Sequence, residues 1–297
     1  MPIAAYTLEL FPEKPAFYLG LLISGSAVGW FVGPATAGWL LDLTGTWRAA
    51  FWVIGAAALV VAVLQFSLWP KVTEGTRSGV FFQKSILEPK NLLMLFLLSL
   101  VLTFQMSAEF GFTMWFPAFL RTEIAMSATG AGLLTGCFGI GMAIGRPIMG
   151  HVADRLGYRL IGIVGSAVMG LFFMLALLFS NPLLRATSVF SAGFIGSAAT
   201  GGLWTFTGLL FTSFKGLALG VIVTFAYCLS SLGPIIIGYI GDHYSIATAL
   251  WTVTVPCAFL AALAFLPTFI LQGARRGQQQ SKSDECPGPD ILGSSPN

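Results

Sequence analysis

The chain divides into long apolar runs separated by short polar segments. Eight runs contain no Asp, Glu, Lys or Arg, apart from a single Glu in the third. A helix needs about 20 apolar residues, at ~1.5 Å per residue, to cross a bilayer, so each run is long enough to cross once. The predicted membrane helices are 16–41, 49–70, 91–120, 124–145, 160–184, 186–214, 216–241 and 244–274.

The fold class follows from the pattern inside these runs. Apolar and polar residues do not alternate at the two-residue period of a strand, and glycine and proline occur within the runs, as membrane helices tolerate. Hydrophobic residues make up 56% of the chain and charged residues 9%, with a mean hydropathy of +0.84. A soluble domain carries roughly 25% charged residues. The sequence therefore predicts an all-α, polytopic membrane helix bundle with about eight transmembrane helices.

The basic residues indicate how this bundle is oriented. When alternate loops are assigned to opposite sides, one side holds only Arg48, Arg121 and Arg185, and the other holds the remaining twelve of the 15 Lys and Arg. Cytoplasmic loops carry the excess of positive charge, so both termini are predicted to be cytoplasmic in a cell membrane. The lipid bilayer accounts for these charges, and no nucleic-acid partner is expected.

The segment between the fourth and fifth runs carries the most informative motif. A charged, glycine-containing hinge between two apolar runs predicts a tight loop at the bilayer surface, with an acid against a helix N-terminus and arginines that hold it. The motif residues are Gly150, Asp154, Arg155, Gly157 and Arg159. The string resembles the loop signature Gly-x-x-x-Asp-Arg-x-Gly-x-Arg of the major facilitator superfamily of transporters. We expect Asp154, with Arg155 or Arg159, to hold one face of the bundle closed.

An internal repeat relates the two ends of the chain. Gly33-Pro34-x-x-x-Gly38-Trp39-x-x-Asp42 recurs as Gly233-Pro234-x-x-x-Gly238-Tyr239-x-x-Asp242, at an offset of 200 residues. The pattern predicts duplicated bundles. In the family that the chain resembles, two six-helix halves are related in this way. The resemblance makes 16–41 helix five and 216–241 helix eleven, and it implies that the first four helices are missing.

The domain organisation follows from this numbering. Residues 1–70 are predicted to be a remnant of the N-terminal half, helices five and six, and residues 71–90 a polar cytoplasmic linker. Residues 91–274 form the complete six-helix second half. Residues 275–297 are too polar to bury an apolar surface and are predicted to be a flexible cytoplasmic tail.

The first long run contains small residues at regular intervals. Small residues on one face allow close helix packing in lipid, and a proline removes a backbone donor and bends the helix. The residues concerned are Gly20, Gly29, Gly33, Pro34 and Gly38. Their spacing is similar to the helix-five glycine pattern of proton-coupled efflux antiporters, with Ala37 at a position where glycine is usual. Generic small-residue packing is the alternative explanation.

Glu109 is the only acidic residue well inside a predicted span. Gln105 lies four residues earlier and therefore on the same helix face. A carboxylate at that depth is costly unless it faces a polar cavity or is protonated. A group that gains and loses a proton there could couple transport to a proton gradient. The alternative is an acid that water reaches from the outer end and that pairs with Arg121.

Other candidate residues come from helices ten and eleven, which the resemblance places around the same central cavity. Aromatic side chains provide flat, weakly polar walls suited to amphipathic ligands. The candidates that could contact a substrate are Trp204, Thr224 and Tyr227. Helix packing is the alternative role for each. Arg146 is expected to reach the cytoplasmic surface or to pair within the loop.

These observations point to a secondary active transporter of a small solute. The preferred mode is proton-coupled efflux of a drug or metabolite, with the solute and protons as partners. Two alternatives stay open: an organic-anion/proton symporter, since Trp115-Phe116-Pro117 resembles anion symporters, and a membrane fragment that does not transport. The sequence shows no nucleophile–base pair or metal-ligand spacing, so no enzyme activity, cofactor or metal is predicted, and it leaves the oligomeric state open.

Overall fold

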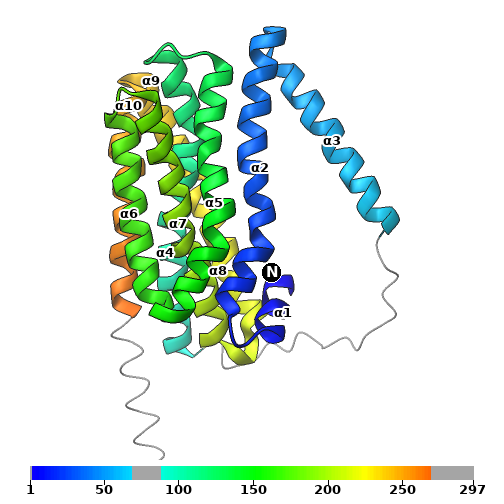
Figure 1. Ribbon diagram of the computed structural model, residues 1–297. Helices are drawn as coiled ribbons and strands as arrows, with labels where there is room; N and C mark the ends of the chain where they lie inside the picture. The colour runs from blue at the N-terminus through cyan, green and yellow to red at the C-terminus, as the bar shows by residue number, and fades with distance from the viewer. Residues whose placement is uncertain (1, 69–87, 269–297) are drawn as a thin grey trace, which may run out of the picture.

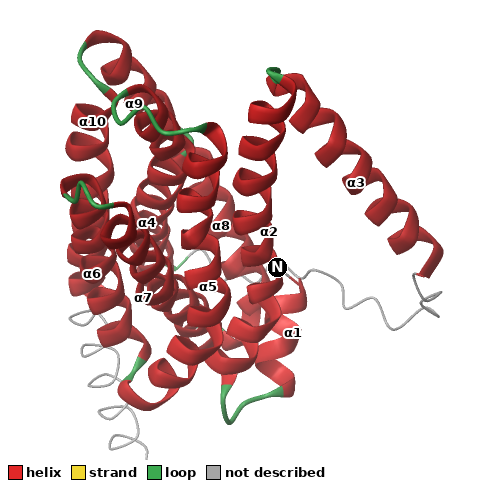
Figure 2. Ribbon diagram, turned by 45° about the horizontal axis from the view of Figure 1, so that its top comes forward, coloured by secondary structure: helices red, strands yellow, loops and turns green. Residues whose placement is uncertain are grey.

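The computed structural model describes residues 2–68 and 88–268, and all regular secondary structure in these ranges is helical (Figure 2). The longer helices, in chain order, are α1 (Pro2–Leu10), α2 (Pro15–Thr44), α3 (Trp47–Leu68), α4 (Pro89–Thr122), α5 (Ala128–Leu156), α6 (Tyr158–Leu178), α7 (Pro182–Leu210), α8 (Lys215–Ser230) and α9 (Leu232–His243). The chain continues with the short helix α10 (Ile246–Ala249), a π-helical turn (Leu250–Thr254) and a helix over 255–268. The predicted all-α bundle is confirmed.

Seven helical segments in the described ranges are long and apolar enough to cross a membrane. They are α2 to α6, the pair α8–α9, and the segment Ile246–Thr268. The eighth predicted span corresponds to α7, which has 29 residues but is less hydrophobic and does not belong to this set. α7 packs along both α5 and α6, where many of its small and hydroxyl-bearing residues are buried. Its neighbours therefore shield it from lipid.

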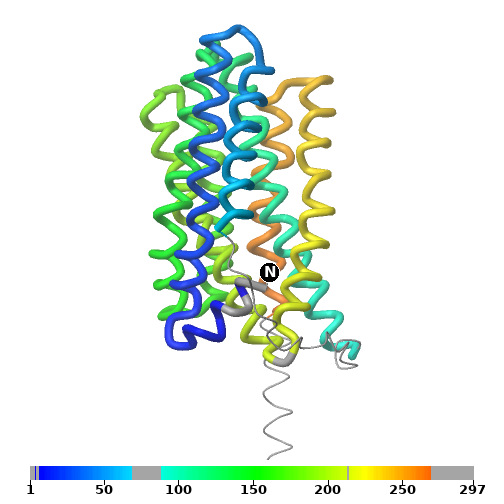
Figure 3. The backbone as a smooth tube through the Cα atoms, turned by 90° about the vertical axis from the view of Figure 1, so that its right-hand side faces the viewer, coloured from blue at the N-terminus to red at the C-terminus, as the bar shows by residue number. Residues whose placement is uncertain are grey.

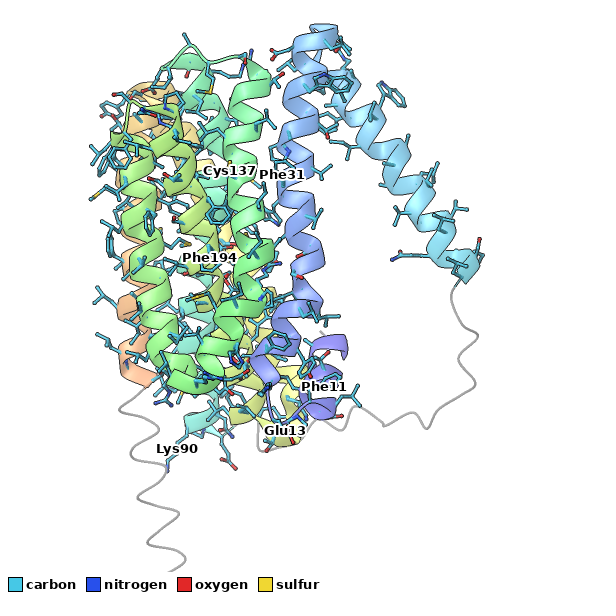
Figure 4. The ribbon with its side chains drawn as sticks, viewed as in Figure 1. Phe11, Glu13, Phe31, Lys90, Cys137 and Phe194 are labelled. Carbon is cyan, nitrogen blue, oxygen red and sulfur yellow. The ribbon has the colours of Figure 1, made fainter. Side chains whose placement is uncertain are left out.

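The helices α2 and α5 run antiparallel in close contact over most of their length (Figure 1). Glycines make this approach possible, because a Cβ atom at Gly38 would clash with the carbonyl group of Ala128, and one at Gly132 with that of Pro34. Phe31 of α2 lies at the level of Cys137 of α5 in Figure 4, and it covers Gly136. The seam between α2 and α5 is thus packed backbone against backbone.

In contrast, α3 turns away from the bundle at Gly45, whose φ of +68° closes α2 (Figure 1). Figure 3 faces this side of the molecule, and α2 and α3 lie in front of the other helices there. Ala50 is its buried residue, while Trp52 and Phe66 are 78% and 89% exposed. Most of the predicted linker 71–90 and all of the predicted tail 275–297 lie outside the described residues. The proposed domain boundaries there stay predictions.

One predicted helix end was wrong, and one predicted membrane span consists of two consecutive helices. Residues 150–156 are not a loop: they continue α5, and Gly157, with φ +99°, alone separates it from α6. The charge of Arg146 ends the apolar run but does not end the helix. The predicted helix 216–241 is divided at Ser231, where α8 ends and α9 begins. Pro234 lacks the backbone donor that would continue the hydrogen-bond ladder across this point.

Candidate functional site

Glu109 lies at the centre of a buried polar network that joins three helices. This residue, on α4, is 3% exposed. Gln105 Nε2, one turn earlier, donates to Glu109 Oε1 at 2.9 Å, as the four-residue spacing predicts. Thr200 Oγ1 of α7 donates to the same oxygen at 3.3 Å, and Ser166 Oγ of α6 donates to Gln105 Oε1 at 2.9 Å. The network therefore fixes both the carboxyl group and the amide that faces it.

This arrangement suits a group that changes its protonation state. A charged carboxylate in the membrane interior needs donors, and Gln105 and Thr200 supply them. A hydroxyl can both donate and accept, so Thr200 can also accept the proton of a neutral Glu109. Gln105 Nε2 is held from the other side by the sulfur of Met169 at 3.3 Å. The surroundings can thus accommodate the acid in either form.

Arg146 of α5 supplies a positive charge that acts on this network. Instead of pairing within the loop, its Nη1 donates to Ile23 O and, at 2.8 Å, to Ser26 Oγ, both on α2. It also interacts electrostatically with Glu109 and with Tyr227 of α8. The side chain therefore crosses the seam between α2 and α5 rather than extending to the membrane surface.

Aromatic rings from three helices line the same region. Trp30 of α2 stacks on Phe110 of α4 with ring centroids 5.6 Å apart and an interplanar angle of 1°. Phe110 in turn meets Tyr227 edge to face at 5.7 Å. Tyr227 is 48% exposed, and the other two rings are partly exposed. Phe110 directly follows Glu109 on α4, so the three rings form a partly exposed wall next to the polar network.

Two aspartates tie the ends of α2 and α5 together. Asp154, near the end of α5, accepts hydrogen bonds from the backbone of Ala16 and Phe17 at the start of α2, both at 3.1 Å. Asp42, near the end of α2, accepts from the backbone of Ala128 and Thr129 at the start of α5, at 3.1 and 2.7 Å. Each carboxylate lies at a helix N-terminus, where unpaired N–H groups and the helix dipole favour an anion.

The side chains that contact Asp154 of the loop signature differ from those predicted. Asp154 does face a helix N-terminus, but the hydroxyl that supports it belongs to Tyr158, whose Oη donates at 3.0 Å. Arg155 is exposed, and the guanidinium of Arg159 lies 4.5 Å from the centre of the Phe206 ring. Gly150 allows α5 to approach the backbone of Ala16.

The structure does not bring all the other predicted site residues to this network. Trp204 packs in an apolar cluster with Leu8 and Leu19, and Thr224 is exposed on α8. Of the helix-five glycines, Gly20 and Gly38 meet the backbone of α5, whereas Gly29 and Gly33 have open space where a Cβ would be.

Several residues of the site were missed by the sequence analysis. Ser166, Thr200 and Trp30 carry no motif, and only the folded bundle shows that they meet Gln105, Glu109 or Phe110. Asp42 did carry a signal, because it closes the first copy of the internal repeat. Its position after a predicted helix end could have suggested a cap for a neighbouring helix.

Comparison with known proteins settles the family. The model described as Major Facilitator Superfamily matches residues 1–124 and 95–285. The chain belongs to the Major Facilitator Superfamily. The resemblance that rested on the loop signature is therefore confirmed, and the helical bundle is that of a multi-pass membrane protein of this superfamily. Its relatives are transporters, not enzymes.

Three transport-related proteins resemble the chain at low identity. It is 27% identical to the cis,cis-muconate transport protein of Acinetobacter baylyi, over 94% of this chain and 70% of that protein. It is 27% identical to the fosmidomycin resistance protein of Escherichia coli, over 83% of this chain and 60% of that protein. A putative metabolite transport protein of Haemophilus influenzae is 25% identical, with 80% and 62% covered. The chain thus spans about two thirds of the length of these relatives.

Proposed function

We propose that the protein is a secondary active transporter that moves a small solute across the cell membrane in exchange for, or together with, protons. The observation that carries this proposal is Glu109: a buried carboxyl group with partners on α4 and α7 that suit both protonation states. Unpaired carboxylates are expensive within a membrane, and those that occur there serve proton or ion pathways. The family membership supports the transport function itself.

The orientation of the protein in the membrane forms part of the proposal. Both termini are cytoplasmic by the distribution of Lys and Arg. The end of the bundle that carries Asp154 and α1 then faces the cytoplasm, and the end that carries Asp42 faces outside. The seam between α2 and α5 separates α2, in the first predicted domain, from α5, in the second. Rocking of one half against the other would open one end of this seam at a time.

The two aspartate caps provide a physical basis for such alternation. Each cap links α2 to α5 at one end, through hydrogen bonds from a helix N-terminus to a carboxylate. An opening toward the cytoplasm would break the cap at Asp154, and an opening toward the outside would break the cap at Asp42. Because both caps are local and polar, water can replace either one when that end opens.

Efflux by proton antiport is the preferred mode. The helix-five spacing of small residues supports it, and so does the relative named for fosmidomycin resistance, a property that export of the drug can confer. Symport of an organic anion is the second candidate. The muconate transport relative supports it, and Arg146 contributes a positive charge to the seam. Both modes need a proton carrier, and Glu109 serves in either.

The experiment measures solute flux in proteoliposomes that contain the native full-length protein, with a pH gradient imposed across the membrane. Fosmidomycin and cis,cis-muconate are the first solutes to test. Glu109→Gln keeps the side-chain shape and the hydrogen bond from Gln105 while fixing the neutral state. We expect this variant to lose gradient-driven flux, by about 100-fold or more, while it still exchanges solute when no gradient is applied.

Glu13→Gln serves as the matched control, because Glu13 is exposed in the segment before α2. The control should keep the pH dependence of the unmodified protein. If Glu109→Gln also keeps it, Glu109 is not the proton carrier and the proposal fails. The sign of the flux decides between the two modes, since solute moves against the proton current in antiport and with it in symport.

A further inference from the structure

Arg146 is unusual because it lies in the membrane interior without a carboxylate partner in contact. An ion pair between two described residues joins Lys215 to Glu9, at the cytoplasmic end, and does not involve Arg146. Arg146 Nη1 is occupied by α2, but its Nε is buried and has no hydrogen-bond partner. A buried donor without a partner destabilises the protein. A cation retained at that cost within a membrane is a sign of function.

The guanidinium of Arg146 is suited to bind a carboxylate. An arginine whose Nη1 is occupied presents its other edge, Nε and Nη2, as a planar fork that matches the two oxygens of a carboxylate. A carboxylate on that edge would satisfy the buried Nε and neutralise the guanidinium. Glu109 interacts with Arg146 electrostatically, but no ion pair joins the two described side chains and Arg146 Nε has no hydrogen-bond partner, so Glu109 does not occupy the fork.

The aromatic rings beside Arg146 define the shape of what binds. Tyr227 interacts electrostatically with Arg146 and is in contact with Phe110, which stacks on Trp30. Arg146 and Trp30 lie on opposite sides of the seam, and α4 and α8 contribute the other two rings. Flat, partly exposed rings favour a flat ligand, and aromatic or conjugated groups gain most from stacking or edge contacts.

We propose that Trp30, Phe110, Arg146 and Tyr227 form the solute-binding site, and that the solute is a planar organic carboxylate. The inference rests on the proposed transport function and names the substrate class for it. Arg146 binds the carboxylate through Nε and Nη2 once the groups that cover Nε move aside, and the three rings contact the flat body of the solute. Because Ser26 and Ile23 hold the same guanidinium, binding at Arg146 also connects the solute directly to α2.

The test compares three probes of nearly identical shape and different charge: benzoate, benzamide and benzamidinium. Equilibrium binding is measured on the full-length protein in nanodiscs, at one pH and with no gradient, by quenching of tryptophan fluorescence. We expect benzoate to bind at least about tenfold more tightly than benzamide, and benzamidinium to bind least. Equal binding of the three probes, or tighter binding of the cation, overturns the proposal without any variant.

Variants then assign the effect to Arg146. Arg146→Gln should reduce benzoate affinity by about tenfold or more and leave benzamide affinity unchanged, which also shows that the variant is folded. Arg146→Lys keeps the charge but loses the fork, so an intermediate loss is expected. Arg48→Gln is the matched control, because Arg48 also lies beside a tryptophan but is exposed on α3. Unchanged benzoate affinity in Arg146→Gln would refute the assignment.

This outcome is independent of the proton-coupling proposal. Binding at fixed pH does not require Glu109 to carry a proton, so Glu109→Gln could keep its pH-dependent flux while the charge preference of the site stands. Conversely, a site that ignores ligand charge would leave the role of Glu109 intact. The two proposals therefore fail in different experiments.

Discussion

The two copies of the internal repeat have the same sequence pattern but different surroundings. In α2, Gly38 faces the backbone of α5, and Asp42 caps the start of that helix. In α9, Gly238 faces the ring of Trp115 on α4, and Asp242 is exposed. The glycine that opens each copy also differs, since Gly33 has open space where Gly233 meets Ser107.

This difference shows what a repeat specifies. The pattern fixes where a helix face lacks side chains, where the helix can bend and where an acidic residue lies at its end. It does not fix which neighbour uses these features, because the neighbour is set by the packing of the whole bundle. In the first copy the neighbour is a backbone, which cannot yield, whereas in the second it is a side chain, which can move.

The largest effect is expected at the first copy. Gly38→Val places a branched side chain against the carbonyl of Ala128, which forces α2 away from α5. We expect the free energy of unfolding to fall by about 3 kcal/mol or more. The measurement is thermal unfolding in detergent, together with amide hydrogen exchange along α2. Gly33→Val is the matched control on the same helix and should change neither by much, because a Cβ at that position meets nothing within 4 Å. Equal effects at the two positions would contradict the assignment of the seam.

A moderate effect is expected at the second copy. In Gly238→Ala the new methyl group would lie 2.8 Å from Trp115 Cζ2, so the indole must shift. The shift strains or breaks the hydrogen bond from Trp115 Nε1 to Pro234 O, which is 2.9 Å long. We expect the free energy of unfolding to fall by about 1–2 kcal/mol. Thermal unfolding measures it. In a Trp115→Phe background, which lacks the indole N–H, the same substitution should cost clearly less.

The smallest expected effect distinguishes Asp42 from Asp242. Asp42→Ala removes the acceptor for the N–H groups of Ala128 and Thr129, so hydrogen exchange at the start of α5 should become faster. Asp242→Ala serves as its counterpart and should leave exchange in every described helix unchanged. Similar protection of Ala128 and Thr129 in both variants would show that the cap at Asp42 does not form.

The sequence predicted the framework of the fold well, for a physical reason. Lipid demands long apolar runs, and such runs are visible without any knowledge of their neighbours. Helix ends were harder, since residues 150–156 stay helical although they are polar: a helix can extend beyond the bilayer into water. The sequence did not predict the break at Ser231. Pro234 indicates that a helix can be interrupted nearby, but only the backbone hydrogen bonds of the folded chain show at which residue this happens.

The site could be predicted only in part, because its partners come from different helices. The link between Gln105 and Glu109 is local and follows from their spacing. Thr200 lies 91 residues after Glu109, on α7, and nothing in a single sequence reports that contact. Trp204 shows the converse: an aromatic residue one turn from Thr200 faces a different neighbour and packs against α1.

The modest hydropathy of α7 has a consequence for how the protein is made. The translocon releases segments into lipid according to their apolarity, and each buried hydroxyl or glycine of α7 lowers that tendency. The helices against which α7 packs, α5 and α6, both precede it in the chain and emerge from the ribosome first. They would therefore provide a preformed surface in the membrane, and α7 would enter as the third member of a group rather than as an independent span. During biogenesis, assembly of this part of the protein would thus begin before synthesis of α8 and α9 is complete.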